Sequence, residues 1–92
     1  MNLIKELNID ENILKRIIDI NDESIIYTIE NNLNEIKTSI DYLNKIGIKP
    51  INELLIYEID YLIEPERIKQ IKKDNTELIN SINNDYIYIE NI

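Results

Sequence analysis

Hydrophobic residues recur at helical spacing through the middle of the chain. Aliphatic residues follow one another at intervals of three and four positions, at Ile25, Ile29, Leu33, Ile36, Ile40 and Leu43. Because about 3.6 residues complete a helical turn, this spacing places every member on one helical face. The pattern predicts one long amphipathic helix or two consecutive helices, since Asn31 and Asn32 interrupt it with residues that favour helix ends.

Start and stop signals predict further helices on both sides of this stripe. A short helix is expected from residue 2 or 3 to Leu7, and Asp10 is a good N-cap for a second helix. The second helix carries an apolar stripe of Ile13, Leu14, Ile17 and Ile18. Gly47 stands where a left-handed C-cap is needed, Ile48 supplies the usual hydrophobic contact, and Pro50 is suited to a first helical position.

The C-terminal half is more ambiguous. A short helix is expected from Pro50 through Leu54 and Leu55, and Pro65 is expected to open a helix that continues through Ile82. Between them, apolar and polar residues alternate over 57–63 as in a strand, and 86–90 is a second run of β-favouring residues. The leading prediction is an all-α single domain over 1–92 with four to six short helices. An α+β fold that pairs 57–63 with 86–90 is the alternative.

Two segments of the C-terminal half align with each other without a gap. Residues 52–68 match 76–92 at a shift of 24, with identical or similar residues at several positions, including Glu53 with Glu77 and Leu54 with Leu78. A narrow residue alphabet produces such matches by chance, so both a helical repeat and coincidence stay open.

The segment 40–63 resembles a known supersecondary element. Its key positions are Leu43, Ile46, Gly47, Ile48, Leu54 and Leu55. In this order they resemble the helical repeat of mitochondrial transcription termination factors, and the helix-Gly-helix element in the carboxy-terminal domain of the RNA polymerase alpha subunit. The resemblance implies nucleic-acid binding through a basic concave face. This stretch departs from that pattern because it offers only Lys45 and Lys49 among acidic residues.

Composition limits the class of protein. The chain has 92 residues, enough for one modest core, and its apolar side chains are almost all Ile and Leu. It has no Cys and no His, and no long apolar run, so we expect a cytoplasmic protein without disulfides or a membrane span. The abundance of Ile, Asn, Lys and Tyr is typical of an AT-rich genome.

Charge indicates the sign of a partner. Eighteen acidic and ten basic residues give a net charge of -8, which repels nucleic acid and favours basic partners. Acidic residues without neighbouring cations supply the predicted partner-binding set, namely Asp19, Asp22, Glu23, Glu30, Glu58, Asp60 and Glu64. One basic cluster is the candidate nucleic-acid-binding set, namely Arg67, Lys69, Lys72 and Lys73. The ordinary interpretation of both sets is that they are solvated surface charges.

Catalytic and metal-binding patterns are weak. Without Cys or His, the serines have no imidazole to activate them, so we predict no enzyme, no cofactor and no metal site. Residues 19–30 partly follow a calcium-binding EF-hand loop, but Ser24 stands where that loop needs Gly, and Asp22 as an N-cap explains the same residues.

The sequence therefore predicts a non-enzymatic protein that docks on another protein through an acidic surface. A sharper form of this hypothesis is a phage-type inhibitor that presents carboxylates where nucleic-acid phosphates would bind. The alternative is a helical-repeat protein that binds nucleic acid directly through its basic cluster.

Overall fold

The computed structural model describes all 92 residues and contains eight α-helices, one 3-10 helix and no strand. The elements are α1 (Leu3–Leu7), α2 (Glu11–Asn21), α3 (Ile25–Asn31), α4 (Leu33–Lys45), α5 (Ile51–Tyr57), α6 (Ile59–Leu62), α7 (Pro65–Ile68), α8 (Thr76–Asn84) and the 3-10 helix η1 (Tyr86–Asn91). The all-α prediction is confirmed. The helices outnumber the expected four to six because single residues, such as Asn32 and Glu58, separate consecutive helices.

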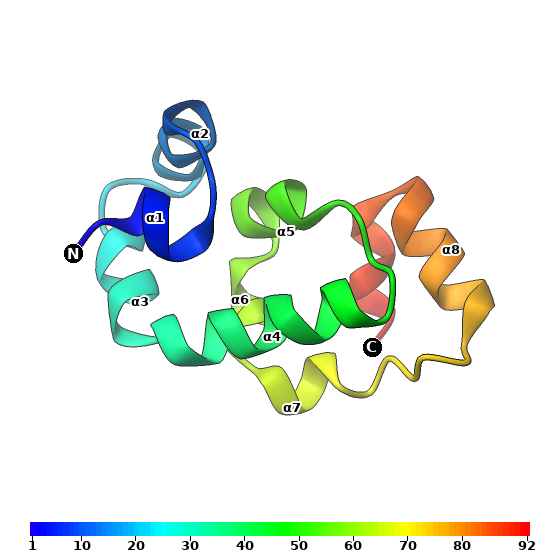
Figure 1. Cartoon of the computed structure of the whole chain (residues 1–92). Helices are drawn as coiled ribbons and strands as arrows, with labels where there is room; N and C mark the ends of the chain where they lie inside the picture. Colours follow the sequence, from blue (N-terminus) through cyan, green and yellow to red (C-terminus); the bar gives the residue numbers. More distant parts are fainter.

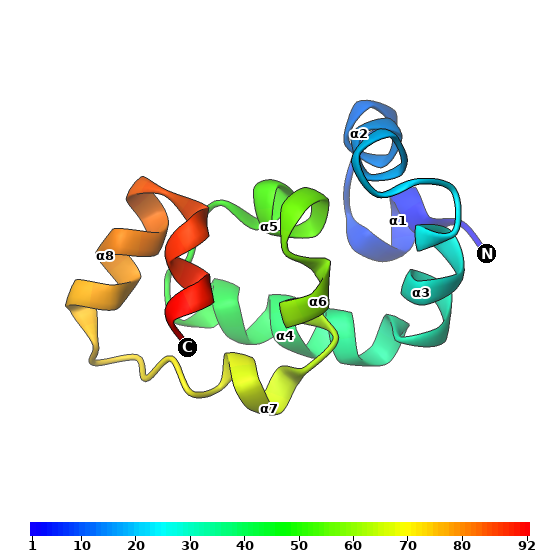
Figure 2. The same cartoon turned by 180° about the vertical axis from the view of Figure 1, so that it is seen from behind.

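Helix α4 is the central element (Figure 1). Helices α1, α2 and α3 lie around its N-terminal end, α5 and α7 lie on opposite sides of it, and α8 with η1 lies beyond its C-terminal end (Figures 1 and 2). The molecule extends 36 × 22 × 19 Å. No helix is both long enough and apolar enough to cross a bilayer.

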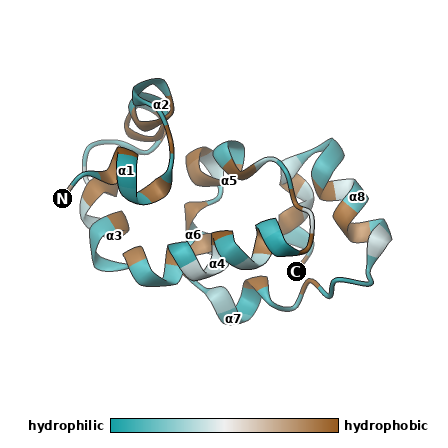
Figure 3. Ribbon diagram, in the orientation of Figure 1, coloured by the Kyte–Doolittle hydropathy of each residue, from teal (hydrophilic) through white to brown (hydrophobic).

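One hydrophobic core connects these helices. It consists of 18 buried Ile and Leu side chains contributed by every element. All members of the predicted central stripe lie in this core or pack against it. Figure 3 shows that the longer helices carry both hydrophobic and hydrophilic residues, as expected for helices that bury only one side.

Three local signals in the N-terminal half act as predicted, namely Asp10, Asn32 and Gly47. The Asp10 side chain accepts a hydrogen bond from the Ile13 N–H at 2.9 Å, which caps α2. The central stripe divides into α3 and α4 at Asn32. After α4, Gly47 adopts φ +90°. Ile48 is buried, and its N–H donates a hydrogen bond to the Leu43 carbonyl at 2.9 Å, which completes the C-cap of α4.

The helix expected from Pro65 to Ile82 is two helices. Pro65 does open α7, but α7 ends at Ile68, and α8 begins only at Thr76. The side chain of Asn75 accepts a hydrogen bond from the Leu78 N–H at 3.2 Å and caps α8. The prediction was wrong because the apolar residues keep a helical spacing across the polar linker 69–75. The Asn75 cap nevertheless starts a new, separate helix.

The α+β alternative is wrong. Residues 57–63 form the end of α5 and the whole of α6, and 86–90 belong to η1. The buried apolar residues of the first segment are Ile59 and Leu62, three positions apart, and Leu55 of α5 is buried four positions before Ile59, so helical periodicity overrides the strand-like alternation. The Asp85 side chain accepts a hydrogen bond from the Ile87 N–H and starts η1.

The gapless alignment of 52–68 with 76–92 is not matched by the helix boundaries. Helix α5 ends at Tyr57 and the break follows at Glu58, whereas α8 continues to Asn84 and its break lies at Asp85. The aligned positions of a repeat with a shift of 24 would place that second break at Ile82, which is helical and buried. The two segments share only a helix that is followed by a short helix.

Candidate functional site

Two tyrosines from distant parts of the chain stack on each other. Tyr57 ends α5 and Tyr86 begins η1, and their ring centroids lie 5.1 Å apart with an interplanar angle of 11°. Arg16 of α2 donates a hydrogen bond from Nη2 to the Tyr57 hydroxyl at 2.6 Å. The stacking and the hydrogen bond order the Tyr57 side chain. Tyr57 is still 37% exposed, so it remains accessible to a partner.

Several carboxylates lie near this aromatic pair, as does Lys49 at the edge of the same groove. Glu53 precedes Tyr57 by one helical turn, and it lines a groove of about 470 Å³ together with Asp85 and Tyr86. Glu90 and Asp60 both lie close enough to affect the ionisation of the intervening Glu58. We name the exposed acids and the ring pair together the tyrosine–carboxylate face, which comprises Glu53, Tyr57, Asp60, Asp85, Tyr86 and Glu90.

Glu58 lies beneath this face. It is only 8% exposed, and its Oε2 atom has no hydrogen-bond partner. Burial, followed by the side-chain hydrogen bond and the negative charge of Glu90 and then the charge of Asp60, raises the pKa of Glu58 to about 7. Glu58 was predicted as a docking residue, but its burial excludes it from an exposed docking surface.

The phenol of Tyr86 is held in its neutral form by the same surroundings. Burial raises the pKa of Tyr86, and Tyr57, Glu58, Asp85 and Glu90 contribute further by opposing a negative charge. Tyr86 therefore presents an uncharged ring close to Asp85 and Glu90.

The remaining predicted acids do not gather in one place. Asp19 forms an ion pair with Lys15 at 2.8 Å, and Glu64 forms one with Arg67 at 3.6 Å. Glu23 is exposed at the turn between α2 and α3, and Glu30 is half-buried on α3. Of the predicted set, only Asp60 is an exposed member of the tyrosine–carboxylate face.

Asp22 has a structural role that differs from the predicted N-cap. It follows α2 with φ +89° and ψ 173°, a backbone conformation that residues other than glycine rarely adopt. Its carboxylate accepts hydrogen bonds from the Ser24 N–H at 2.7 Å and from the Ser24 hydroxyl, and these bonds lower the pKa of Asp22. The carboxylate thus stabilises the turn that leads into α3.

The residues of the predicted basic cluster, like the predicted acids, do not gather in one place. Arg67 pairs with Glu64 and lies over the Tyr61 ring at 4.3 Å, and Lys69 pairs with Glu66 at 3.8 Å. Lys72 and Lys73 form no ion pair and lie instead near Lys45 at the end of α4. The four residues therefore do not form one free basic patch.

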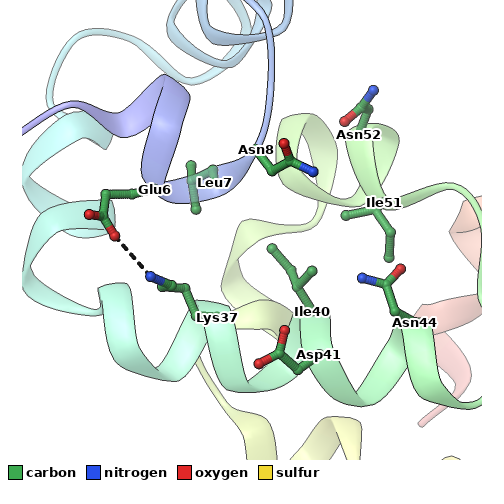
Figure 4. Close-up of a pocket in the computed structure, with 9 residues that line it drawn as sticks. All are labelled: Glu6, Leu7, Asn8, Lys37, Ile40, Asp41, Asn44, Ile51 and Asn52. Atoms are coloured by element: carbon green, nitrogen blue, oxygen red, sulfur yellow. Dashed lines mark hydrogen bonds and ion pairs between the residues drawn. The ribbon is translucent and has the colours of Figure 1, made fainter.

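A different groove lies between α1, α4 and α5 (Figure 4). It has a volume of about 350 Å³, and nine residues line it, namely Glu6, Leu7, Asn8, Lys37, Ile40, Asp41, Asn44, Ile51 and Asn52. Lys37 donates a hydrogen bond to Glu6 at 2.8 Å, and this bond is the main cause that lowers the pKa of Glu6. The ion pair joins α1 to α4 at one side of the groove.

No group of three or more His, Cys, Asp or Glu side chains is arranged to hold a metal ion. Most of the residues that partly follow the EF-hand pattern lie in helices, with Asp19 and Asn21 at the end of α2 and Glu30 in α3, and only 22–24 form a turn between them. They do not form a continuous binding loop.

The sequence alone does not identify Glu53, Asp85 and Glu90 as members of a common surface. Glu53 was visible within an acidic run, but Asp85 and Glu90 adjoin it only through the packing of η1 against the rest of the molecule. The signal that pointed in this direction was the pair of tyrosines, each next to acidic residues in the sequence.

No protein-family model, no curated protein and no solved structure matches the chain. The resemblance of 40–63 to transcription termination factor repeats therefore stays a prediction.

Proposed function

We propose that this is a non-enzymatic binding protein that docks through its tyrosine–carboxylate face onto a basic surface of another protein. The observation that carries the proposal is the stacked Tyr57–Tyr86 pair at 5.1 Å with the exposed Glu53 and Asp85 beside it. Aromatic side chains are enriched as anchors of protein interfaces. Because stacking and the Arg16 hydrogen bond already order Tyr57, binding loses little further side-chain entropy.

Electrostatics support the choice of a basic partner. The chain carries a net charge of -8, and a field of this sign accelerates encounter with a positive surface. The exposed acids of the face form no ion pairs within the protein, unlike Asp19 and Glu64. Their charges are therefore free to pair with lysine and arginine side chains of a partner.

The sharper proposal is that the partner is a nucleic-acid-handling protein and that this face occupies its nucleic-acid site. A surface that binds single-stranded nucleic acid combines cations for phosphates with side chains that stack on bases. The tyrosine–carboxylate face offers the complementary set, with carboxylates in place of phosphates and stacked rings in place of stacked bases. Binding of this kind inhibits the partner by competition.

A variant that neutralises the face tests the proposal. Glu53→Gln, Asp60→Asn and Glu90→Gln together remove three of its four negative charges while keeping side-chain size, and Asp85 is kept because it caps η1. We expect the wild-type protein to capture a basic protein from an extract of the source cells at low salt. With the purified captured protein, the triple variant should associate about tenfold more slowly near 50 mM salt and lose this difference at high salt.

A second triple variant controls for total charge. Glu11→Gln, Asp41→Asn and Glu77→Gln remove the same charge from exposed positions outside the face. Equal losses in the two variants, or no capture at low salt, would contradict docking through this face. If the sharper proposal holds, nucleic acid added to the purified complex displaces the protein.

Direct nucleic-acid binding is the competing outcome. The wild-type protein is titrated against labelled single- and double-stranded nucleic acid near 50 mM salt, a condition that strengthens phosphate contacts. Micromolar binding that is lost when Arg67, Lys69, Lys72 and Lys73 are neutralised would replace the proposal with the nucleic-acid-binding alternative.

A further inference from the structure

A groove lined by three lysines lies where the linker between α7 and α8 passes the C-terminal end of α4. Lys45 and Ile46 at the end of α4 face Lys72, Lys73 and Asp74 of the linker, and Tyr42 completes the lining. The groove has a volume of about 500 Å³. The two segments run close together in both views of the molecule (Figures 1 and 2).

The walls of the groove are fixed by the core. Tyr42 donates a hydrogen bond from its hydroxyl to the Ile71 carbonyl, which ties the linker to α4. Ile71 is completely buried immediately before Lys72. The lysines therefore extend from backbone that is anchored on both sides of the groove.

The charge of this groove is unusual for the molecule. Four of the seven cations outside the groove pair with carboxylates, namely Lys15, Lys37, Arg67 and Lys69, whereas Lys5, Arg16 and Lys49 lie apart from one another along the chain. Lys45, Lys72 and Lys73 form no ion pair, and Asp74 is the one acid among the six lining residues. A surplus of positive charge thus faces one cavity of a protein whose net charge is -8.

A purely structural role explains only part of this arrangement. Lys45 lies in the last turn of α4, where a cation interacts favourably with the helix dipole. Lys72 and Lys73 lie outside any helix, and the weak hydrogen bond from Lys72 to the Lys69 carbonyl at 3.4 Å leaves their charges unneutralised. An anionic ligand would neutralise all three lysines at once.

The chemistry of the lining indicates the class of ligand. Lysine binds phosphate as a point charge, whereas paired recognition of planar carboxylates favours arginine. Ile46 and the ring of Tyr42 offer apolar surface to a flat body, and Asp74 can accept a hydrogen bond from a sugar hydroxyl. A volume of about 300–1,000 Å³ is usual for small-molecule sites. We propose that this groove binds a nucleoside monophosphate, with its phosphate held by Lys45, Lys72 and Lys73.

Titration of the intact chain with AMP, GMP, CMP and UMP, followed by amide NMR spectra, tests this proposal. We expect saturable shifts confined to residues around the groove, with at least one nucleotide binding below about 1 mM. Adenosine and inorganic phosphate, added as separate ligands, should each bind at least tenfold more weakly, because each supplies only part of the contacts. The four nucleotides all failing to bind would overturn the proposal.

Single lysine variants locate the site. Lys45→Gln, Lys72→Gln and Lys73→Gln should each weaken binding about tenfold, the usual effect of losing one hydrogen bond to a charged group. Lys49→Gln removes the same charge from an exposed lysine outside the groove and should leave binding unchanged. Melting temperatures confirm that the variants remain folded. Equal loss in all four variants would mean that net charge alone attracts the anion, and would refute the proposed site.

A single-stranded oligonucleotide separates this proposal from nucleic-acid binding. A nucleotide site should bind the oligonucleotide no more tightly than the free nucleotide, with a shallow dependence on salt. Much tighter oligonucleotide binding would overturn the proposal if the binding constant also fell with salt as steeply as expected for several phosphate contacts. The lysines would then be assigned to nucleic-acid binding.

Discussion

The buried carboxyl group of Glu58 makes the stability of this protein depend on pH. Glu58 is 8% exposed, and burial together with Glu90 and Asp60 raises its pKa from the usual 4.5 to about 7. Replacing Glu58 by Gln keeps the shape of the side chain and removes the charge. We expect this substitution to stabilise the protein at pH 8 and to change its stability far less at pH 4.5.

The sign and size of the effect follow from the two pKa values. Below pH 4.5 the carboxyl group is protonated in both the folded and the unfolded chain, so its favourable contribution is complete. Between pH 4.5 and about 7 the unfolded chain releases the proton and the folded protein retains it, so the free energy of unfolding falls as pH rises. At about 1.36 kcal/mol per pH unit, the loss approaches ~3 kcal/mol at pH 8.

Urea denaturation followed by circular dichroism at pH 4.5, 6 and 8 measures this loss. The wild-type protein should become less stable across the series, whereas Glu58→Gln should remain nearly constant. Glu77→Gln, at an exposed position on α8, controls for the change in net charge. The pKa values of Glu6 and Asp22 are lowered, so their stabilisation is complete at pH 6 and 8 and begins to be lost only near pH 4.5, in the direction opposite to the effect of Glu58.

A second substitution identifies the neighbour responsible. Glu90→Gln removes the negative charge beside Glu58, so it should lower the pKa of Glu58 and recover part of the stability lost at pH 8. If the wild-type protein is as stable at pH 8 as at pH 4.5, and Glu58→Gln adds nothing at either pH, the reasoning about a buried Glu58 is refuted.

Two further substitutions test the backbone and the core by thermal or urea denaturation. Gly47→Ala should cost about 1–2 kcal/mol, because Gly47 has φ +90° and no atom lies within 4 Å of an added Cβ, so the cost comes from the backbone alone. No loss would mean that α4 ends in a different conformation. Ser39→Ala should cost about 1–3 kcal/mol, because its hydroxyl donates to the Leu62 carbonyl at 2.7 Å in the core. Thr38→Ala, exposed on the same helix, is the control, and equal effects at the two positions would contradict the buried hydrogen bond.

The helices of the N-terminal half could be predicted well from the sequence. The cap at Asp10, the apolar stripe, its division near Asn32 and the left-handed Gly47 all depend on residues within one or two helical turns. Such short-range preferences act before any distant segment packs. For this reason they are visible in the order of residues alone.

The C-terminal half was harder to predict because its patterns of apolar residues were compatible with more than one secondary structure. Residues 57–63 alternate like a strand, yet Ile59 and Leu62 both enter the core from one side of a helix. Packing against the other helices decided between the two periods, since burial of Leu62 requires the helical form. Across the linker before α8, the spacing was also compatible with a helix that the Asn75 cap interrupts.

The candidate sites depend on contacts that the sequence order does not encode locally. Composition and charge showed an acidic chain without residues for nucleophile–imidazole catalysis, and the basic partner that they predict stays a prediction. Only the tertiary structure placed Tyr86 on Tyr57, buried Glu58 beside Glu90, and brought Lys45 to Lys73. Helix capping and periodicity act over a few residues and can be read along the chain. Burial and charge pairing depend on which distant helices the shared core brings together, so they are settled only when the whole chain folds.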